Sequence, residues 1–410
     1  MRRVFITGMG GVTPLGHDVE TSFKNIIDGQ CGIGPITHFD TTEFKVSLAA
    51  QVKDFDMDPY LSARERKFND RFTQFARIAS MQAMQQANFN MQSINNKRFG
   101  VIIGSGIGGI ESIEKSKESL TERGPTRISP YFIPMALVNL AAGTVAIDHQ
   151  AKGVCSAVVT ACAAGSSAIG EAFHKIKFNQ QDIMLAGGSE ASITPLAIGG
   201  FMVMRALHEG SDPNRASIPF DKNRSGFVMG EGAGIVVLEE LEHALKRNAT
   251  ILGEIIGYGS SCDAHHITAP NPDGEGASQA MLLAIEDAGI NFDEVDYINA
   301  HGTSTPLNDK TETYAIKQTF KEHAEKLSVS STKSHLGHLL GASGAVEAII
   351  CLKSLQEGII PATINYQISD SECDLDVVAN QAKKQNIKVA MSNSLGFGGH
   401  NASLIFRKWD

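Results

Sequence analysis

The feature that most constrains the fold is a pattern that occurs twice along the chain. Residues 158–174, VVTACAAGSSAIGEAFH, join an apolar run to a helix through a turn of small residues. Residues 333–348, KSHLGHLLGASGAVEA, contain a similar turn and helix in the second half. A shift of 176 residues aligns five identical positions of the two helices: Gly165 with Gly341, Ser167 with Ser343, Glu171 with Glu347, Ala172 with Ala348 and Lys177 with Lys353. The repeat predicts two duplicated halves, in which His338 takes the place that Cys162 has in the first.

Apolar runs alternate with helical patterns in both halves, which is typical of an α/β fold. Strands are predicted at residues 4–8, 99–104, 153–159, 182–188, 235–240 and 295–300, and a strand with its following turn at residues 251–261. Helices are predicted at residues 19–27, 62–87, 166–178, 276–289 and 311–320. We therefore expect a parallel, helix-covered sheet in each half, with residues 1–250 and 251–410 as the two domains. A long glycine-rich and methionine-containing loop is expected through Phe201 and Arg205.

Composition narrows the class of protein. A chain of 410 residues is too long for one ordinary core. The net charge of −9 argues against nucleic acid as the general partner, because polyanions bind basic surfaces. The apolar run near the N-terminus is too short for a signal peptide or a membrane span, so we expect a cytoplasmic protein without membrane insertion. The six cysteines form no CxxC pair, which predicts reduced thiols and no zinc site.

Cys162 is the leading candidate for a nucleophile. It follows an apolar, β-branched run that suits a buried strand, and a helix begins just after it. The N–H groups and partial positive charge of a helix N-terminus favour thiolate over thiol. Small neighbours leave room for a substrate and for a backbone amide that faces it. The other interpretation is a buried structural cysteine at a tight turn.

Two histidines and a glycine-rich loop accompany this cysteine. His301 follows an apolar strand in HGTSTPLND, where open α/β sheets place ligand-facing residues, and His338 precedes the second repeated helix. Near the C-terminus, NSLGFGGHN places Phe397 among glycines whose amides could approach an anion. A cysteine with two histidines favours nucleophilic catalysis. Metal binding is the weaker interpretation, because no pair has the spacing of a zinc motif.

Two other functions are compatible with parts of this pattern. Residues 104–109, GSGIGG, satisfy the dinucleotide fingerprint G-x-G-x-x-G and would suit a nucleotide-dependent oxidoreductase. The polar stretch that follows offers no second strand ending in an acid, so a close-packed turn is the favoured interpretation. A cysteine hydrolase would share Cys162 and one histidine.

The motifs TACAAGSSAIGEAFHKIK, GFVMGEGAG, HGTSTPLND, KSHLGHLLGASGAVEA and NSLGFGGHN, in this order and spacing, resemble the β-ketoacyl-acyl carrier protein synthases. These are the type II condensing enzymes of fatty acid synthesis, and the resemblance covers Val4 to Phe406. It implies a thiolase-like fold, with two duplicated α/β halves in a five-layered α-β-α-β-α sandwich, and a homodimer. The initiating synthases pair cysteine with histidine and asparagine, whereas this chain has two histidines. His400 stands where many relatives have threonine.

The resemblance also implies a role for each catalytic residue. Cys162 would take the acyl group from an acyl carrier protein and form a thioester. His301 and His338 would stabilise the enolate that forms when malonyl carrier protein loses carbon dioxide. The N–H groups of Cys162 and Phe397 would form the oxyanion hole, with Lys333 and Glu347 as supporting residues. No cofactor is implied.

Substrate contacts are expected at two further sets of residues. The resemblance places the acyl pocket and its gate at Ile107, Phe132, Phe201 and Phe397. The pantetheine arm is expected to meet Thr303 and Thr305. Basic side chains that could contact an acidic carrier protein are Arg64, Arg66, Lys67, Arg127 and Arg205. For each basic residue the alternative is an ordinary solvated charge.

Overall fold

The structure is a computed structural model that describes residues 1–409 and contains a ten-stranded sheet in that range. The strand order is β10-β9-β13-β14-β8-β1-β7-β6-β4-β5, so strands of the second half lie beside strands of the first. The first half contributes β1 (Val4–Val12), β4 (Phe99–Gly104), β5 (Cys155–Val158), β6 (Ile183–Glu190) and β7 (Gly232–Glu240). The second half contributes β8 (Gly253–Cys262), β9 (Tyr297–Asn299), β10 (Ser328–Ser330), β13 (Val389–Gly396) and β14 (His400–Arg407). Two small sheets pair β2 (Gly34–Pro35) with β3 (Leu48–Ala49) and β11 (Ile359–Ile360) with β12 (Lys383–Lys384).

Helices cover both faces of the two groups of strands. The helices of the first half are α1 (Val19–Ile27), α2 (Ala63–Phe68), α3 (Arg71–Ala87), α4 (Ile110–Arg123), α5 (Phe132–Ala136), α6 (Leu140–Asp148), α7 (Ala164–Lys177), α8 (Pro195–Val203) and α9 (Leu241–Lys246). Those of the second half are α10 (Glu275–Ala288), α11 (Pro306–Phe320), α12 (Lys333–Leu336) and α13 (Ser343–Glu357).

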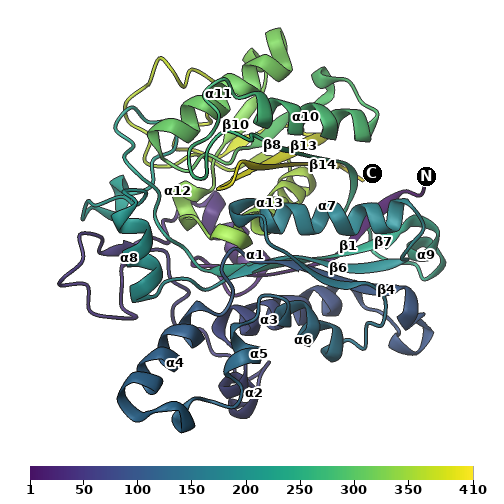
Figure 1. Ribbon diagram of the computed structural model, residues 1–410. Helices are drawn as coiled ribbons and strands as arrows, with labels where there is room; N and C mark the ends of the chain where they lie inside the picture. The colour runs from purple at the N-terminus through teal and green to yellow at the C-terminus, as the bar shows by residue number, and fades with distance from the viewer. Residues whose placement is uncertain (410) are drawn as a thin grey trace.

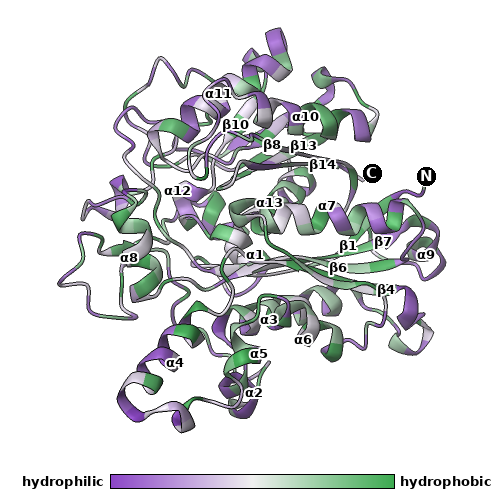
Figure 2. Ribbon diagram, viewed as in Figure 1, coloured by the Kyte–Doolittle hydropathy of each residue, from purple (hydrophilic) through white to green (hydrophobic). Residues whose placement is uncertain are grey.

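The elements form five layers (Figure 1). Helices α3 and α6 cover the strands of the first half, α7 and α13 lie between the two groups of strands, and α10 and α11 cover the strands of the second half. Three residue pairs between the starts of β1 and β8 connect the two groups. Figure 2 shows hydrophobic residues gathered on the strands and on the helix faces that pack against them. The five-layered α-β-α-β-α arrangement is confirmed.

The prediction of parallel sheets is only partly correct. Strand β4 runs parallel to β5 and β6, and β9 runs parallel to β10 and β13. Strand β7 is antiparallel to β6 and β1, and β14 is antiparallel to β13 and β8. Each half is therefore a mixed sheet. In the second half a short turn joins β13 to β14, whereas in the first half a long segment that includes α8 joins β6 to β7.

Three local predictions are also wrong. The first strand, predicted to end at Gly8, continues to Val12 as β1, and its Gly8 and Gly10 pack so closely on α3 that a Cβ would collide with carbonyl oxygens of that helix. The run before Cys162 is an edge strand of the described sheet and is half exposed, not buried. Phe201 belongs to α8 rather than to a loop, because Thr194 caps that helix and Pro195 opens it.

The two halves are related by a shift that differs from the predicted one. Short 3-10 turns precede α7 and α13, at Ala161–Ala163 and Leu340–Ala342, and each begins with a residue at positive φ. These turns differ by 179 residues, not 176, so the counterpart of Cys162 is Gly341. The contacts have the same symmetry, since a Cβ on Gly165 would touch Ala345 and one on Gly344 would touch Ser166. His338 thus belongs to the loop before the second turn.

Candidate active site

A cavity of about 450 Å³ lies where loops of the two halves meet. Nine of the residues predicted from the sequence line it: Ile107, Cys162, Phe201, Arg205, His301, Thr303, Thr305, His338 and Phe397. Lys333 and Glu347 are fully buried beside it. Phe132, on α5, is not among the lining residues of the described chain. The structure therefore brings together most, but not all, of the predicted site.

Cys162 lies in the turn between β5 and α7, at the start of the middle layer. The preceding residue, Ala161, has φ +49°, which turns the chain sharply enough to present the thiol to the cavity. The backbone N–H groups of Phe397 and of Cys162 itself are directed at the sulfur. These two amides can therefore also bind an oxygen that becomes negative next to the sulfur.

The resting form of Cys162 is the thiol. Burial raises the pKa of Cys162 to about 11, although the charge of Lys333 and the two backbone amides oppose this shift. The helix N-terminus is expected to favour the thiolate, but desolvation has the larger effect on the pKa of Cys162. Attack by this sulfur has to be coupled to loss of its proton.

His338 is held as a neutral hydrogen-bond donor. The backbone N–H of Leu340 donates to Nδ1 at 3.3 Å, and the Ser343 hydroxyl lies 2.9 Å from the same nitrogen. Burial and the charge of Lys333 place the pKa of His338 well below its ordinary value. Because Nδ1 accepts a hydrogen bond, the remaining proton of the neutral ring lies on Nε2.

His301 lies directly beside His338. The two ring centroids are 5.3 Å apart, with the planes nearly perpendicular. Burial, followed by the charge of Lys333, lowers the pKa of His301 well below its ordinary value. Glu312 of α11 fixes the loop by accepting the backbone N–H groups of His301 and Gly302, each at 2.8 Å. Burial raises the pKa of Glu312 to about 7. The loop thus presents a second neutral imidazole to the cavity.

Lys333 and Glu347 form a buried ion pair next to the two histidines. Burial raises the pKa of Glu347, and the nearby Lys333 ammonium opposes that shift. The same ammonium lowers the pKa of both imidazoles and of the thiol. Lys333 therefore acts on the site at least through its charge, which the sequence could not decide.

The loop that carries Phe397 approaches Cys162 through a glycine. A Cβ on Gly396 would lie 2.7 Å from the Thr160 carbonyl oxygen and 3.2 Å from the Cys162 nitrogen, so the approach requires glycine. The Phe397 ring lies 6.2 Å from that of Phe201, which in turn is 5.5 Å from Phe227. These aromatic rings give the cavity an apolar wall near the thiol.

Glu190 is a buried residue of the site that the sequence reasoning missed. Its carboxylate accepts the backbone N–H groups of Gly106, Ile107 and Gly108, so the GSGIGG turn encloses a carboxylate of its own chain. A dinucleotide phosphate would require those amides. The interpretation as a close-packed turn is confirmed, and the nucleotide hypothesis loses its basis. The available signal was an acid two residues after the paired glycines that end a predicted strand.

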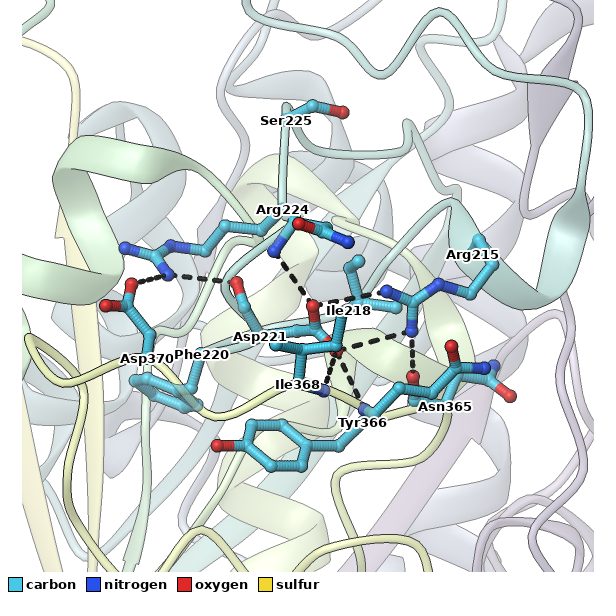
Figure 3. Close-up of polar contacts among 12 residues, drawn as sticks. Arg215, Ile218, Phe220, Asp221, Arg224, Ser225, Asn365, Tyr366, Ile368 and Asp370 are labelled. Carbon is cyan, nitrogen blue, oxygen red and sulfur yellow. Dashed lines mark hydrogen bonds and ion pairs between the residues drawn. The ribbon is translucent and has the colours of Figure 1, made fainter.

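Residues 216–231 form a second missed feature, a segment that fastens the histidine loops. Arg224 donates to the carbonyl oxygens of Thr305 and Pro306. It also pairs with Asp370 at 2.6 Å (Figure 3). Asp221 accepts two hydrogen bonds from Arg215 and two more from backbone amides of the 365–368 loop (Figure 3). The signal was a charged stretch between apolar residues, IPFDKNRSGF.

The same segment also reaches the other two loops. Its Ser217 donates to the Lys333 carbonyl at 2.8 Å, and its Val228 carbonyl accepts the His338 N–H at 2.7 Å. Residues 216–231 therefore contact the segments that carry His301, Lys333 and His338.

The predicted basic residues fall into two places. Arg64, Arg66 and Lys67 belong to α2, which is joined to α5 by stacking of Phe68 on Tyr131. Arg127 precedes α5 and is exposed, whereas Arg205 follows α8 at the cavity. Arg66 pairs with Asp58, so its charge is partly neutralised. Arg205 is the one among the five that lies at the candidate active site.

Two family models match most of the chain, and known proteins match its full length. Residues 1–244 match the N-terminal domain of β-ketoacyl synthase, and residues 252–367 match its C-terminal domain. The chain is 49% identical over 409 residues to 3-oxoacyl-[acyl-carrier-protein] synthase 2 of Synechocystis, covering 100% of this chain and 98% of that protein. It is 50% identical over 409 residues to the protein of the same name from Staphylococcus aureus strain COL, covering 100% of this chain and 99% of that one.

A solved structure is similar along its entire chain. It is a ketosynthase of a type II polyketide system in complex with its acyl carrier protein, and it aligns with a TM-score of 0.93 at 36% identity, covering 100% of both chains. The fold, the cavity and these matches agree. The chain belongs to the β-ketoacyl synthase family.

Proposed function

We propose that this protein condenses an acyl group with malonyl carrier protein to give 3-oxoacyl carrier protein, carbon dioxide and free carrier. The observation that supports this most strongly is the arrangement in one cavity of a thiol, two directed amides and two neutral imidazoles. The full-length relatives carry the name of this activity. A cysteine hydrolase is not supported, because the family is that of condensing enzymes.

In the first half-reaction, the Cys162 sulfur attacks the acyl thioester. The carbonyl oxygen becomes an oxyanion that accepts the N–H groups of Cys162 and Phe397. As the intermediate collapses, the carrier's sulfur leaves and takes up the proton of the Cys162 thiol. The acyl chain lies against the apolar wall of Ile107 and Phe201.

In the second half-reaction, malonyl carrier protein enters the same cavity. Its thioester oxygen accepts hydrogen bonds from His301 and His338, which stabilise the enolate formed when carbon dioxide leaves. The enolate carbon attacks the acyl–Cys162 carbonyl, and the cysteine sulfur leaves and regains a proton. Neutral imidazoles suit this step, because negative charge develops on the oxygen only as carbon dioxide leaves.

Carrier protein and a second copy of this chain are the proposed partners. Arg205 at the cavity, with Arg64, Arg66, Lys67 and Arg127 as further contacts, would meet the acidic carrier, and the pantetheine arm would pass Thr303 and Thr305. The second copy would pair with strand β5, which is an edge of the described sheet. Val159 and Ile147 near that edge are 54% and 76% exposed.

The remaining proposals concern organisation and location. We keep residues 1–250 and 251–410 as the two halves and the cytoplasm as the place of action. Within residues 1–409, none of the helices has the length and apolarity that crossing a bilayer requires.

The test is to supply carrier protein loaded with an acyl chain together with malonyl carrier protein and to determine the masses of the products. A carrier-bound 3-oxoacyl product two carbons longer than the substrate is expected. Release of the free acid at the same rate with and without malonyl carrier protein would favour the hydrolase instead. Light scattering on the same sample is expected to give twice the chain mass, and a monomer would contradict the dimer.

A further inference from the structure

Glu190 has the largest set of hydrogen-bond donors around any carboxylate near the cavity. Its Oε2 accepts Gly106 N–H at 2.6 Å and Gly341 N–H at 3.1 Å. Its Oε1 accepts the N–H groups of Ile107 at 3.2 Å and Gly108 at 3.3 Å. The hydroxyls of Ser105, at 3.0 Å, and Ser192, at 3.2 Å, donate to Oε1 as well. The side chain is completely buried at the end of β6.

These donors come from both halves of the protein. Residues 105–108 form the turn after β4 that carries Ile107 into the cavity. Gly341 lies in the turn before α13, the counterpart of the turn that carries Cys162. One carboxylate therefore fastens the acyl wall of the first half to a turn of the second half.

The second of these turns determines how His338 is held. Gly341 directly follows Leu340, whose backbone N–H donates to Nδ1 of His338. If Gly341 is displaced, the neighbouring Leu340 amide moves with it, and Nδ1 loses the donor that fixes the proton on Nε2. The chain of contacts runs from Glu190 through Gly341 and Leu340 to the proposed donor of the decarboxylation step.

We propose that Glu190 is a positioning residue that sets the acyl-pocket wall and the His338 donor at the same time. The proposal rests on the condensing function proposed above. Glu190 does not line the cavity, so it acts through Ile107 and Leu340 rather than on the substrate. A single substitution at Glu190 should then alter both acyl-chain preference and carbon dioxide release. A substitution at Ile107 should alter only the first, and one at His338 only the second.

The sharpest variant is Glu190→Gln. Its amide can keep one oxygen toward the Oε1 donors, but its NH₂ group then faces the N–H groups of Gly106 and Gly341, which it cannot accept. Both halves of the contact are expected to open. In the Cys162→Gln background, where acylation is absent, carbon dioxide release from malonyl carrier protein should fall by about tenfold or more, as loss of a charged hydrogen bond predicts.

The second readout is acyl-chain preference. It is the ratio of the Cys162 acylation rates measured with carrier protein that bears a long acyl chain and with carrier protein that bears a short one. Because the Ile107 wall loses its anchor, this ratio should change in Glu190→Gln by at least about fivefold. A purely structural loss would lower both rates in the same proportion and leave the ratio unchanged.

Ser105→Ala separates the two effects. The Ser105 hydroxyl contacts Glu190 and also accepts the Gly108 N–H at 3.2 Å, but it has no hydrogen bond to Gly341 among the described residues. This variant should change the chain-length ratio and leave carbon dioxide release at the parental rate. If Glu190→Gln does not fold, Ser105→Ala and the conservative Glu190→Asp carry the test.

Glu239→Gln is the matched control. Glu239 is another fully buried carboxylate, and it lies on β7 opposite Ile183, at the other end of β6. Its loss should reduce stability without altering the chain-length ratio or carbon dioxide release. The proposal is overturned if Glu190→Gln, folded and with measurable condensation, keeps both the parental ratio and the parental decarboxylation rate. If the parental enzyme itself forms no condensation product, the proposed function fails instead.

Discussion

At the scale of single residues, burial favours the uncharged forms of the thiol and of both imidazoles. A thiolate beside a charged imidazole would have been the simpler expectation. Burial keeps Cys162 a thiol and both histidines unprotonated, and Lys333 is the nearby fixed positive charge that biases all three. In the proposed mechanism, a neutral site avoids the cost of burying charge before substrate arrives, and its donors then meet negative charge only on the oxyanion and the enolate.

The titration of Cys162 follows from its burial. With a pKa of about 11, only about one thiol in 10⁴ is ionised at pH 7. Alkylation of Cys162 by iodoacetamide should therefore accelerate about tenfold per pH unit from pH 7 to pH 10, without a plateau. Intact-protein mass against time gives the rate.

The exposed thiols Cys155 and Cys262 must first be replaced by serine, and Cys162→Ala supplies the background. A plateau below pH 8 would mean that the helix N-terminus prevails over desolvation and that our account of the thiol is wrong.

At the scale of elements, the chemistry depends on close approaches between turns. The turn before α7, the Gly396 loop and the turn after β4 meet around Cys162, and small residues at their contacts make room for one another. The position of each backbone amide is therefore a property of packing between elements, and a methyl group in the wrong place can remove an amide from the site.

Gly396→Ala tests one such contact. The added methyl group would meet the Thr160 carbonyl oxygen at 2.7 Å and push the loop outward, which withdraws the Phe397 N–H from the sulfur. Acylation of Cys162 should slow by about a hundredfold, the usual cost of one oxyanion donor.

The control for this variant is Gly143→Ala in α6, where the nearest contact of the new methyl group is 3.9 Å away. Stopped-flow acylation of both proteins decides the matter. An equal rate in Gly396→Ala and Gly143→Ala would exclude the Phe397 amide from the oxyanion hole.

Ile107→Phe tests the acyl wall. Ile107 lines the cavity from a turn held by Glu190, so a larger side chain there should occupy space that a long chain needs. Activity with carrier protein that bears a long acyl chain should fall by at least about tenfold relative to activity with a short acyl chain. Product masses across a series of acyl lengths measure this. Equal losses at every length would make Ile107 merely structural.

At the scale of the whole molecule, the duplicated halves and most residues of the cavity could be predicted from the sequence. The repeated turn and helix predicted two duplicated halves, and the strand-to-helix position of Cys162 and the histidine after β9 predicted residues that line one cavity. Hydrophobic periodicity and the residues that form turns are local properties, so they can be interpreted without knowledge of tertiary packing.

What the sequence could not supply are properties that arise when distant segments meet. Strand direction in the mixed sheets depends on connections, the high pKa of Cys162 depends on burial, and the role of Glu190 depends on amides 82–151 residues away. The shift of 176 residues failed for a related reason, since five identities outweighed the unseen 3-10 turns that set the register at 179.

The central claim is the division of labour between the halves, with the nucleophile in the first and both imidazoles in the second. The measurement is labelled carbon dioxide release from malonyl carrier protein alongside intact-protein mass, on folded Cys162→Gln, His301→Ala and His338→Ala. Cys162→Gln should form no acyl-enzyme and still release carbon dioxide. Each histidine variant should retain some acylation of Cys162 and lose decarboxylation by about a hundredfold or more. Failure of Cys162→Gln to decarboxylate, or parental decarboxylation in the histidine variants, would contradict the account.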